Sequence, residues 1–249
     1  MGADFIQYMI GDIVAAPPRT QHLYQEKFIY LPHCFLANSM PYLSPDITPP
    51  TLKRPPGGDP KMNGCGGPPA DFVFCNFNKH LKFRPDTFRA WLSILQAVDD
   101  SVLCLLENPA DSIKYLMHFI ESYDKSLLSR VRFQSFLPNP FDNQRRTRDM
   151  CHMVLDTPVY NGHTTAVDAL WGAVPIVVYG DGPHMAGRVG HSIMTTLEIP
   201  ELIAQNQSDF VNIAISLASN ATKFRDVRRK LIDTIYAENP RNPFWDLKT

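Results

Sequence analysis

Short, continuously apolar runs alternate with helical patterns along most of this chain. The runs expected to be strands lie at residues 72–77, 101–107, 130–136, 153–156 and 175–180. The helical pattern after the first run opens with Pro85, and proline is favoured in the first turn of a helix. Strands that are apolar on both faces are typical of a parallel sheet covered by helices on both sides. The sequence therefore predicts an α/β fold with a Rossmann-like, doubly wound parallel sheet.

The chain divides into three parts. Residues 37–70 are rich in proline and glycine, which prevents regular structure at this density, so they are expected to form a linker or a long surface loop. Residues 71–249 are expected to form the α/β domain. Residues 1–36 carry two strand-like runs around a helical segment and are too few for an independent domain. They either pack onto the larger domain or are the tail of another one.

The composition does not point to a nucleic-acid or membrane partner. The 249 residues have a formal net charge of -1 and a pI of about 6.7, so no strong field attracts the chain to either surface. No apolar run is long enough to span a bilayer, and the N-terminus lacks a secretory signal. The basic cluster at 228–230 lies in a helical pattern and is expected on a solvated face. The chain is therefore expected to be soluble and intracellular.

The cysteines favour a reducing compartment. They number five, an odd count, and none of them forms a C-x-x-C pair. Cys75 and Cys104 lie inside apolar strand-like runs. Reduced, buried thiols and a cytosolic or nuclear location are therefore expected, instead of a disulfide scaffold or a zinc site. The remaining cysteines are Cys34, Cys65 and Cys151.

A strand, a short loop with Gly162 and a helix follow one another in MVLDTPVYNGHTTAVDALWG. In open α/β sheets, the free N–H groups and positive dipole of such a helix N-terminus can bind an anion. Thr164 and Thr165 would add two hydroxyl donors, and His163 a third donor. Asp168 lies about one helical turn further on, where a carboxylate commonly binds sugar hydroxyls. The segment predicts a cradle for a phosphate-bearing ligand.

The alternative for this segment is a turn and an ordinary capped helix, with Asn161 or Thr164 as the cap. Metal ligands are not indicated, because the histidines are scattered and no HxxxH pair or acidic cluster occurs. A phosphate leaving group would then need cationic side chains. The glycine-rich stretch around Pro183 matches no phosphate-binding motif, and Pro183 is expected to start a helix with Arg188 one turn inside.

Several segments together carry a family resemblance. LDTPVYNGHTTAVDALWGAVPIV resembles the signature region of the nucleocytoplasmic protein O-GlcNAc transferases, and FCNFNKHLKFRPDTFRAWLSIL resembles the strand, loop and helix that precede it. GRVGHSIM and ELIAQNQSDF resemble later helices of this family. GADFIQYMIGD and EKFIYLPHCF resemble the end of its N-terminal catalytic half. The similarity covers nearly the whole chain except the linker.

The resemblance implies a GT-B fold, of which this chain would supply the C-terminal, donor-binding half. It implies inverting transfer of N-acetylglucosamine from UDP-GlcNAc to Ser or Thr hydroxyls of cytoplasmic and nuclear proteins, without a metal or another cofactor. The family's TPR repeats and most of its N-terminal catalytic half have no counterpart in the 249 residues. The sequence is therefore expected to be a fragment, with those parts as expected partners.

Site residues follow from the resemblance by position. His163, Thr164 and Thr165 would hold the diphosphate and neighbouring sugar atoms, and Asp168 would contact the uridine ribose. Lys82 matches the lysine that stabilises the departing diphosphate. A fixed cation at this point would act where negative charge develops.

Two places depart from the family pattern. Lys79 stands where the family has glutamine, and could contact a phosphate as a point charge. Residues 137–144, LPNPFDNQ, should be the uridine-binding loop. Within it, Phe141 replaces a ribose-contacting lysine and Gln144 a base-contacting histidine, which leaves the identity of the nucleotide open. The residues of this loop expected to bind the nucleotide sugar are Asn139, Pro140, Phe141 and Gln144.

Two other functions remain open. SPINDLY-type protein O-fucosyltransferases use GDP-fucose on the same scaffold, although His163 favours the GlcNAc branch, since the fucosyl branch has an all-threonine run there. A non-catalytic nucleotide-binding module is the third possibility, because catalysis requires both halves of the site to be held together.

Overall fold

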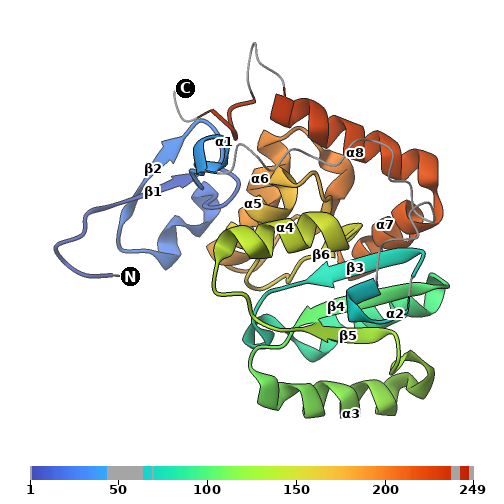
Figure 1. The fold of residues 1–249 in the computed structure, drawn as a ribbon. Helices are drawn as coiled ribbons and strands as arrows, with labels where there is room; N and C mark the ends of the chain where they lie inside the picture. The colour runs from blue at the N-terminus through green and yellow to red at the C-terminus, as the bar shows by residue number, and fades with distance from the viewer. Residues whose placement is uncertain (1, 44–63, 69, 237–241, 247–249) are drawn as a thin grey trace.

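A computed structural model describes residues 2–43, 64–68, 70–236 and 242–246. Its main element is a parallel sheet, which has six strands in the order β5-β4-β3-β6-β7-β8 among the described residues. Figure 1 shows this sheet with helices packed around it. The strands are β3 (Phe72–Asn76), β4 (Ser101–Leu106), β5 (Val131–Gln134), β6 (Met153–Leu155), β7 (Ile176–Tyr179) and β8 (Ile203–Ala204).

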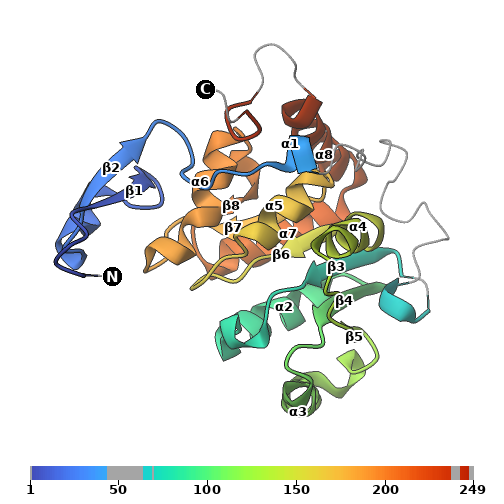
Figure 2. The same ribbon diagram turned by 60° about the vertical axis from the view of Figure 1, so that its left-hand side comes forward.

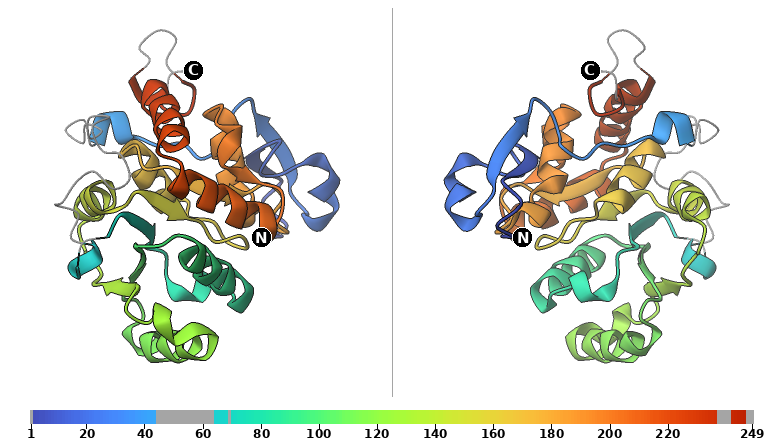
Figure 3. Two further views of the ribbon diagram at one scale, coloured as in Figure 1. Left: turned by 90° about the vertical axis from the view of Figure 1, so that its right-hand side faces the viewer. Right: turned by 90° about the vertical axis from the view of Figure 1, so that its left-hand side faces the viewer.

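Helices cover both faces of the sheet, as expected for a doubly wound fold. Helices α2 and α7 contact each other on one face, while α4 and α5 contact each other on the other (Figure 3). The prediction of an α/β, doubly wound parallel sheet is confirmed. The helices are α2 (Pro85–Ala97), α3 (Ile113–Asp124), α4 (Pro140–Met150), α5 (Thr164–Trp171), α6 (Val189–Thr196), α7 (Gln207–Ser219) and α8 (Ala221–Tyr236).

The core lies on both sides of the central strands. Every residue of β3 and β4 is buried, which explains why these runs are apolar without alternation. Trp91 of α2 and Phe210 of α7 are fully buried against one face. The five expected strands are present, and β8 is an additional one. With two residues, β8 is too short to give a hydrophobic pattern.

The order in which the chain adds strands to the sheet reverses at β3. It runs from β3 to β4 and β5 on one side, and then returns through α4 to β6 on the other side. β3 and β6 are neighbours, with Cys75 opposite Val154. In doubly wound sheets, ligands bind at the carboxyl ends of the strands at such a switch point. The segments that follow Asn76 and Leu155 therefore border the expected ligand position.

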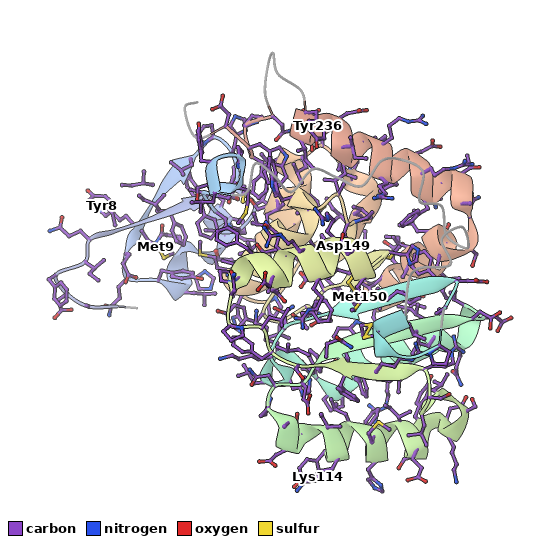
Figure 4. All side chains as sticks on the ribbon, in the orientation of Figure 1. Tyr8, Met9, Lys114, Asp149, Met150 and Tyr236 are labelled. Atoms are coloured by element: carbon purple, nitrogen blue, oxygen red, sulfur yellow. A yellow bond between two sulfur atoms is a disulfide. The ribbon has the colours of Figure 1, made fainter. Side chains whose placement is uncertain are left out.

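The leading residues form a small unit of their own. β1 (Tyr8–Asp12) pairs in parallel with β2 (Lys27–Leu31), and the segment between them is a 3-10 helix (Pro18–Leu23). Figure 2 shows this unit beside the larger domain, and Figure 4 shows Tyr8 at its outer side. Tyr8 is 53% exposed.

The leading unit is bonded to the larger domain. The Asp12 carboxylate accepts a hydrogen bond from the Ser192 hydroxyl at 2.7 Å. The Arg188 side chain donates to the Ala15 carbonyl at 2.9 Å and to the Gly182 carbonyl at 2.8 Å. Of the two alternatives for residues 1–36, packing onto the larger domain is thus observed.

Three expectations about local structure need correction. Residues 44–63 and 69 of the expected linker lie outside the described residues, but α1 (Met40–Leu43) and a 3-10 helix (Gly64–Gly66) are regular structure within 37–70. The helix expected from Pro183 begins at Val189. Arg188 is its N-cap, and this buried side chain is held by its bonds to the Ala15 and Gly182 carbonyls. Arg228 is also buried and donates to the Ala173 carbonyl, so the cluster at 228–230 is not wholly solvated.

The expectation of reduced cysteines is wrong for four of the five. Disulfides join Cys65 to Cys104 and Cys75 to Cys151, and Cys34 is the free cysteine. Cys75 and Cys104 are opposite each other on β3 and β4, and each pairs with a cysteine from a segment packed alongside. Separations of 39 and 76 residues hide these pairings in the sequence. The thiols therefore no longer support a cytosolic or nuclear compartment.

A search of the described residues finds no helix long and apolar enough to cross a membrane.

Candidate functional site

Lys82 bridges the two strand ends at the switch point. After β3 the chain turns through Asn78 into a short 3-10 helix (His80–Lys82). The Lys82 ammonium donates to the Asn161 carbonyl at 2.8 Å and to Asn78 Oδ1 at 3.1 Å, and lies 4.0 Å from the centre of the Tyr160 ring. An ammonium group has three N–H donors. The two bonds to described residues leave one donor for a ligand.

The charge of Lys82 depends on a buried carboxylate. Burial lowers the pKa of Lys82, and the negative charge of Asp156 opposes that shift. Asp156 follows β6 and is 0% exposed. Burial raises its pKa to about 7, against hydrogen bonds from backbone N–H groups and the charge of Lys82. The two groups thus stabilise each other's charged forms.

The loop after β6 has a fixed shape. Asp156 Oδ1 accepts from the Gly162 N–H at 2.8 Å. The buried Asn161 side chain donates to the Thr157 carbonyl at 2.9 Å and accepts from the Gly190 N–H at 2.9 Å. A Cβ on Gly162 would lie 2.5 Å from Thr165 Oγ1, so a larger residue here would force the Thr165 side chain to move. The sequence pattern is thus explained by close packing at the start of α5.

The N-terminus of α5 is free to bind a ligand. Its N-cap is His163, which makes no side-chain capping bond, so neither Asn161 nor Thr164 caps the helix as the alternative supposed. Thr164 is exposed, and Thr165 Oγ1 donates to Asn78 Oδ1 at 3.0 Å. The first N–H groups of a helix lack intrahelical partners and attract anions.

His163 sits beside this N-terminus as a weak base. Its Nε2 is 3.1 Å from the Ala186 carbonyl oxygen. Burial lowers the pKa of His163, and the nearby Lys82 charge lowers it further. A neutral imidazole gives its one N–H to the Ala186 carbonyl and leaves Nδ1 as an acceptor, so Lys82 supplies the positive charge.

Residues 181–188 contact the loop after β6 through the Ala186 carbonyl. The Ala186 carbonyl accepts the Asn161 backbone N–H at 2.9 Å, in addition to its contact with the His163 ring. The same segment contains Arg188, which binds the leading unit. Asp181, at its start, pairs with Arg19 of the leading unit at 2.6 Å.

A second polar cluster joins α4 to α5. Burial raises the pKa of Asp168 to about 7, and a hydrogen bond with the Asn143 side chain opposes the rise. Asn143 Oδ1 also accepts from Arg146 at 2.6 Å. Arg146 donates to the Ser135 carbonyl at 2.6 Å and stacks on the Phe77 ring at 4.2 Å. Asp168 therefore faces α4, not Lys82.

The expected uridine-binding loop is shorter than predicted. Asn139 caps α4 by accepting the Phe141 N–H at 3.0 Å, and Pro140 is the first helical residue. Phe141 is 37% exposed. Gln144 is buried inside α4, and its side chain donates to Met40 Sδ at 3.0 Å. The expectation of a loop across 137–144 is thus wrong for the part from Pro140 onward, because proline at this point starts a helix.

Lys79 is exposed at the N-cap of the 3-10 helix, three residues before Lys82. The sequence reasoning missed three residues of the site, Asn78, Asp156 and Arg146. Asn78 and Asp156 follow β3 and β6 directly, so their position at strand ends was the available signal. Arg146 gave none, because its helix appeared uniformly polar.

The described residues contain no group of three or more His, Cys, Asp or Glu side chains that could hold a metal ion.

A comparison with known families decides the assignment. The sequence profile of glycosyl transferase family 41 matches residues 63–242. The chain belongs to this family. It is thus a glycosyltransferase sequence, and residues 160–175, which include His163, Thr164 and Thr165, lie inside the matched region.

Family 41 relatives and a solved structure resemble the chain over most of its length. The probable UDP-N-acetylglucosamine–peptide N-acetylglucosaminyltransferase SEC of Arabidopsis thaliana is 30% identical over 235 residues, covering 92% of this chain and 23% of the relative. The Arabidopsis protein of the same description called SPINDLY is 30% identical over 238 residues, covering 93% and 24%. A mutant O-GlcNAc transferase of Thermobaculum terrenum has a TM-score of 0.74 at 26% identity, covering 96% of this chain and 42% of that one.

The chain therefore spans about a quarter of the length of these curated relatives. Together with the doubly wound sheet, the match to the T. terrenum enzyme gives the fold as the C-terminal half of a GT-B glycosyltransferase.

Proposed function

We propose that this family 41 chain supplies the donor-binding half of a protein O-GlcNAc transferase. The reaction is transfer of N-acetylglucosamine from UDP-GlcNAc to a Ser or Thr hydroxyl, with inversion and without a metal. The observation that carries this proposal is the position of Lys82, which lies at the switch point beside the uncapped N-terminus of α5. The names of the curated relatives support the choice of donor and acceptor.

The geometry suits a diphosphate leaving group. The acceptor oxygen attacks C1 of the sugar while the bond from C1 to the diphosphate oxygen breaks, and the electron pair leaves with UDP. Lys82 and the first N–H groups of α5 stabilise that charge, aided by the exposed Thr164 hydroxyl. His163 and Thr165 would join them when the diphosphate replaces their bonds to Ala186 and Asn78. The acceptor's proton passes to a base that we assign to the N-terminal half. Fixed cations and N–H dipoles take the place that a metal ion has in other enzymes.

The nucleoside is assigned to the second cluster. Asp168 lies on α5 about one turn after Thr165, and the segment from Asn139 to Gln144 is the N-cap and first part of α4, which packs on α5. We assign Asp168 to the ribose, and Phe141 to stacking on the base. Lys79 is assigned to a phosphate as an exposed second cation.

The partners are a nucleotide sugar, protein acceptors and an N-terminal catalytic half. The location in the cytoplasm and nucleus is proposed from the family resemblance alone, because the paired cysteines do not support it. Exposed apolar side chains on one face of the leading sheet support the last partner, because a two-stranded parallel sheet with such a face needs a covering element. These side chains are Tyr8, Ile10, Ile29 and Leu31.

Calorimetry with UDP tests the donor site directly. We expect binding by the 249-residue chain and its loss in a Thr164→Ala/Thr165→Ala variant. Thr195→Ala, at an exposed threonine of α6, is the matched control and should bind like the wild type. Preference for GDP would move the assignment to an O-fucosyltransferase, and binding of neither nucleotide would refute the donor site. Sugar transfer to a peptide after addition of the N-terminal half tests the activity itself.

A further inference from the structure

Asp156 is a buried carboxylate that packing of the fold does not require. It is 0% exposed and lies under the loop that follows β6. One of its oxygens accepts the Gly162 N–H, while Oδ2 is buried and has no hydrogen-bond partner among the described residues. An incompletely paired buried carboxylate lowers the stability of a fold. Such a group calls for a role beyond packing.

The bonds of Asp156 and Lys82 meet on one peptide group. Asp156 accepts from the N–H of Gly162 at 2.8 Å, and Lys82 donates to the carbonyl of Asn161 at 2.8 Å. These two atoms belong to the same planar amide, whose N–H and C=O point in opposite directions. The carboxylate thus binds the positive end of the amide dipole and the ammonium binds its negative end. Both bonds are charge-assisted, and they prevent the peptide from turning over.

Close packing keeps water away from the carboxylate. A Cβ on Gly190 would lie 3.2 Å from Asp156 Oδ2 and 2.8 Å from the Val178 side chain, so α6 approaches here only because it has glycine. Few charges surround Asp156. Among the described residues, Lys82 is the charged side chain that interacts with Asp156, and Lys82 also interacts with His163. Charge interactions are stronger where water is excluded.

We propose that Asp156 is a positioning residue of the donor site, which clamps the Asn161–Gly162 peptide against Lys82. The clamp fixes the Lys82 ammonium and the N–H groups at the start of α5 in the arrangement that a diphosphate requires. Asp156 itself does not touch the ligand. This inference rests on the proposed function, since it names how the diphosphate subsite is kept in shape.

The test separates the diphosphate from the nucleoside. UDP and uridine are titrated into the wild type, Asp156→Asn and Glu26→Gln. The matched control Glu26 is another buried carboxylate, which accepts the Gly2 N–H at 2.7 Å within the leading unit and is not assigned to the site. In Asp156→Asn we expect the affinity for UDP to fall by roughly tenfold or more, while uridine binds as before. Glu26→Gln should leave both affinities unchanged even if it melts earlier.

Two further measurements distinguish positioning of the diphosphate site by Asp156 from a general loss of stability in Asp156→Asn. In the Lys82→Met background, Asp156→Asn should weaken UDP binding by less than it does in the wild type, because one of the two groups that Asp156 positions is already absent. In the wild type, the Gly162 amide proton should be shifted downfield in NMR spectra and should titrate with the carboxylate. Asp156→Asn should abolish this titration.

The outcomes are distinguishable. If the wild type binds no nucleotide, the proposed function and this inference both fall. If the wild type binds UDP and Asp156→Asn leaves both affinities unchanged, only the inference is overturned. A loss of the same size for UDP and for uridine would also overturn it, because a merely structural residue would give that result.

Discussion

Replacing Gly162 by alanine probes the closest approach in the site. The added Cβ would lie 2.5 Å from Thr165 Oγ1, whereas ordinary contacts begin at 3.4 Å. The Thr165 side chain must therefore rotate, and its 3.0 Å hydrogen bond to Asn78 is lost. Crowding of this kind costs about 1–3 kcal/mol and a lost hydrogen bond about 0.5–1.5 kcal/mol, while the stiffer unfolded chain returns about 0.4–1 kcal/mol. We expect a net loss of roughly 1–3 kcal/mol.

Thermal unfolding and UDP calorimetry measure the two consequences. Each kcal/mol lowers the Tm of a chain of this size by about 2–4 °C. UDP binding should weaken by about tenfold, since one donor of the cradle moves. The double variant Gly162→Ala/Thr165→Ala removes the atom that the new Cβ meets, so it should recover the part of Tm lost to crowding, but not the part due to the hydrogen bond to Asn78 and not the affinity. A Gly162→Ala variant with wild-type Tm and affinity would refute the close approach.

Three further predictions concern charge. Lys82→Met should reduce UDP binding by roughly tenfold to a hundredfold by calorimetry, and exposed Lys79→Met clearly less; equal losses would contradict the geometry. The contribution of Asp156 and Asp168 to the free energy of unfolding should fall as pH rises from about 4 to about 7, because folding raises their pKa from 3.8 to about 7, so that the unfolded chain releases these protons first. His80 and His163, whose pKa folding lowers, contribute in the opposite direction. Urea titrations isolate the Asp156 contribution, since the free energy of unfolding should fall less with pH in Asp156→Asn than in the wild type. Arg188→Ala should lower Tm by several degrees, because it leaves two carbonyls unpaired; an unchanged Tm would show that the leading unit is held otherwise.

The layer structure was accessible from the sequence because burial on both faces leaves a direct mark. β3 and β4 had to be apolar at nearly every position, and the helices between strands had to show one apolar face. β8 left no such mark, since two residues carry no period. The start of α6 was predicted too early. After Pro183 the chain forms a 3-10 helix at 185–187, and α6 begins only after the buried Arg188.

The site was only partly accessible for a related reason. Thr164, Thr165 and His163 are close in sequence to the helix they serve, so the local pattern found them. Asn78 and Asp156 act across β3 and β6, and their bonds depend on strand order, which no local pattern contains. The disulfides could not be predicted for the same reason, because each joins a strand cysteine to a cysteine outside the sheet, in the 3-10 helix at 64–66 or at the end of α4.

The segment from 181 to 188 contacts both parts of the molecule. Asp181 and Arg188, at its two ends, bind the leading unit, while the Ala186 carbonyl accepts the Asn161 N–H and contacts the His163 ring. A displacement of the leading unit would therefore strain or break bonds that position the proposed diphosphate site. We expect a partner that binds the leading unit to change the affinity of that site through these few carbonyl oxygens.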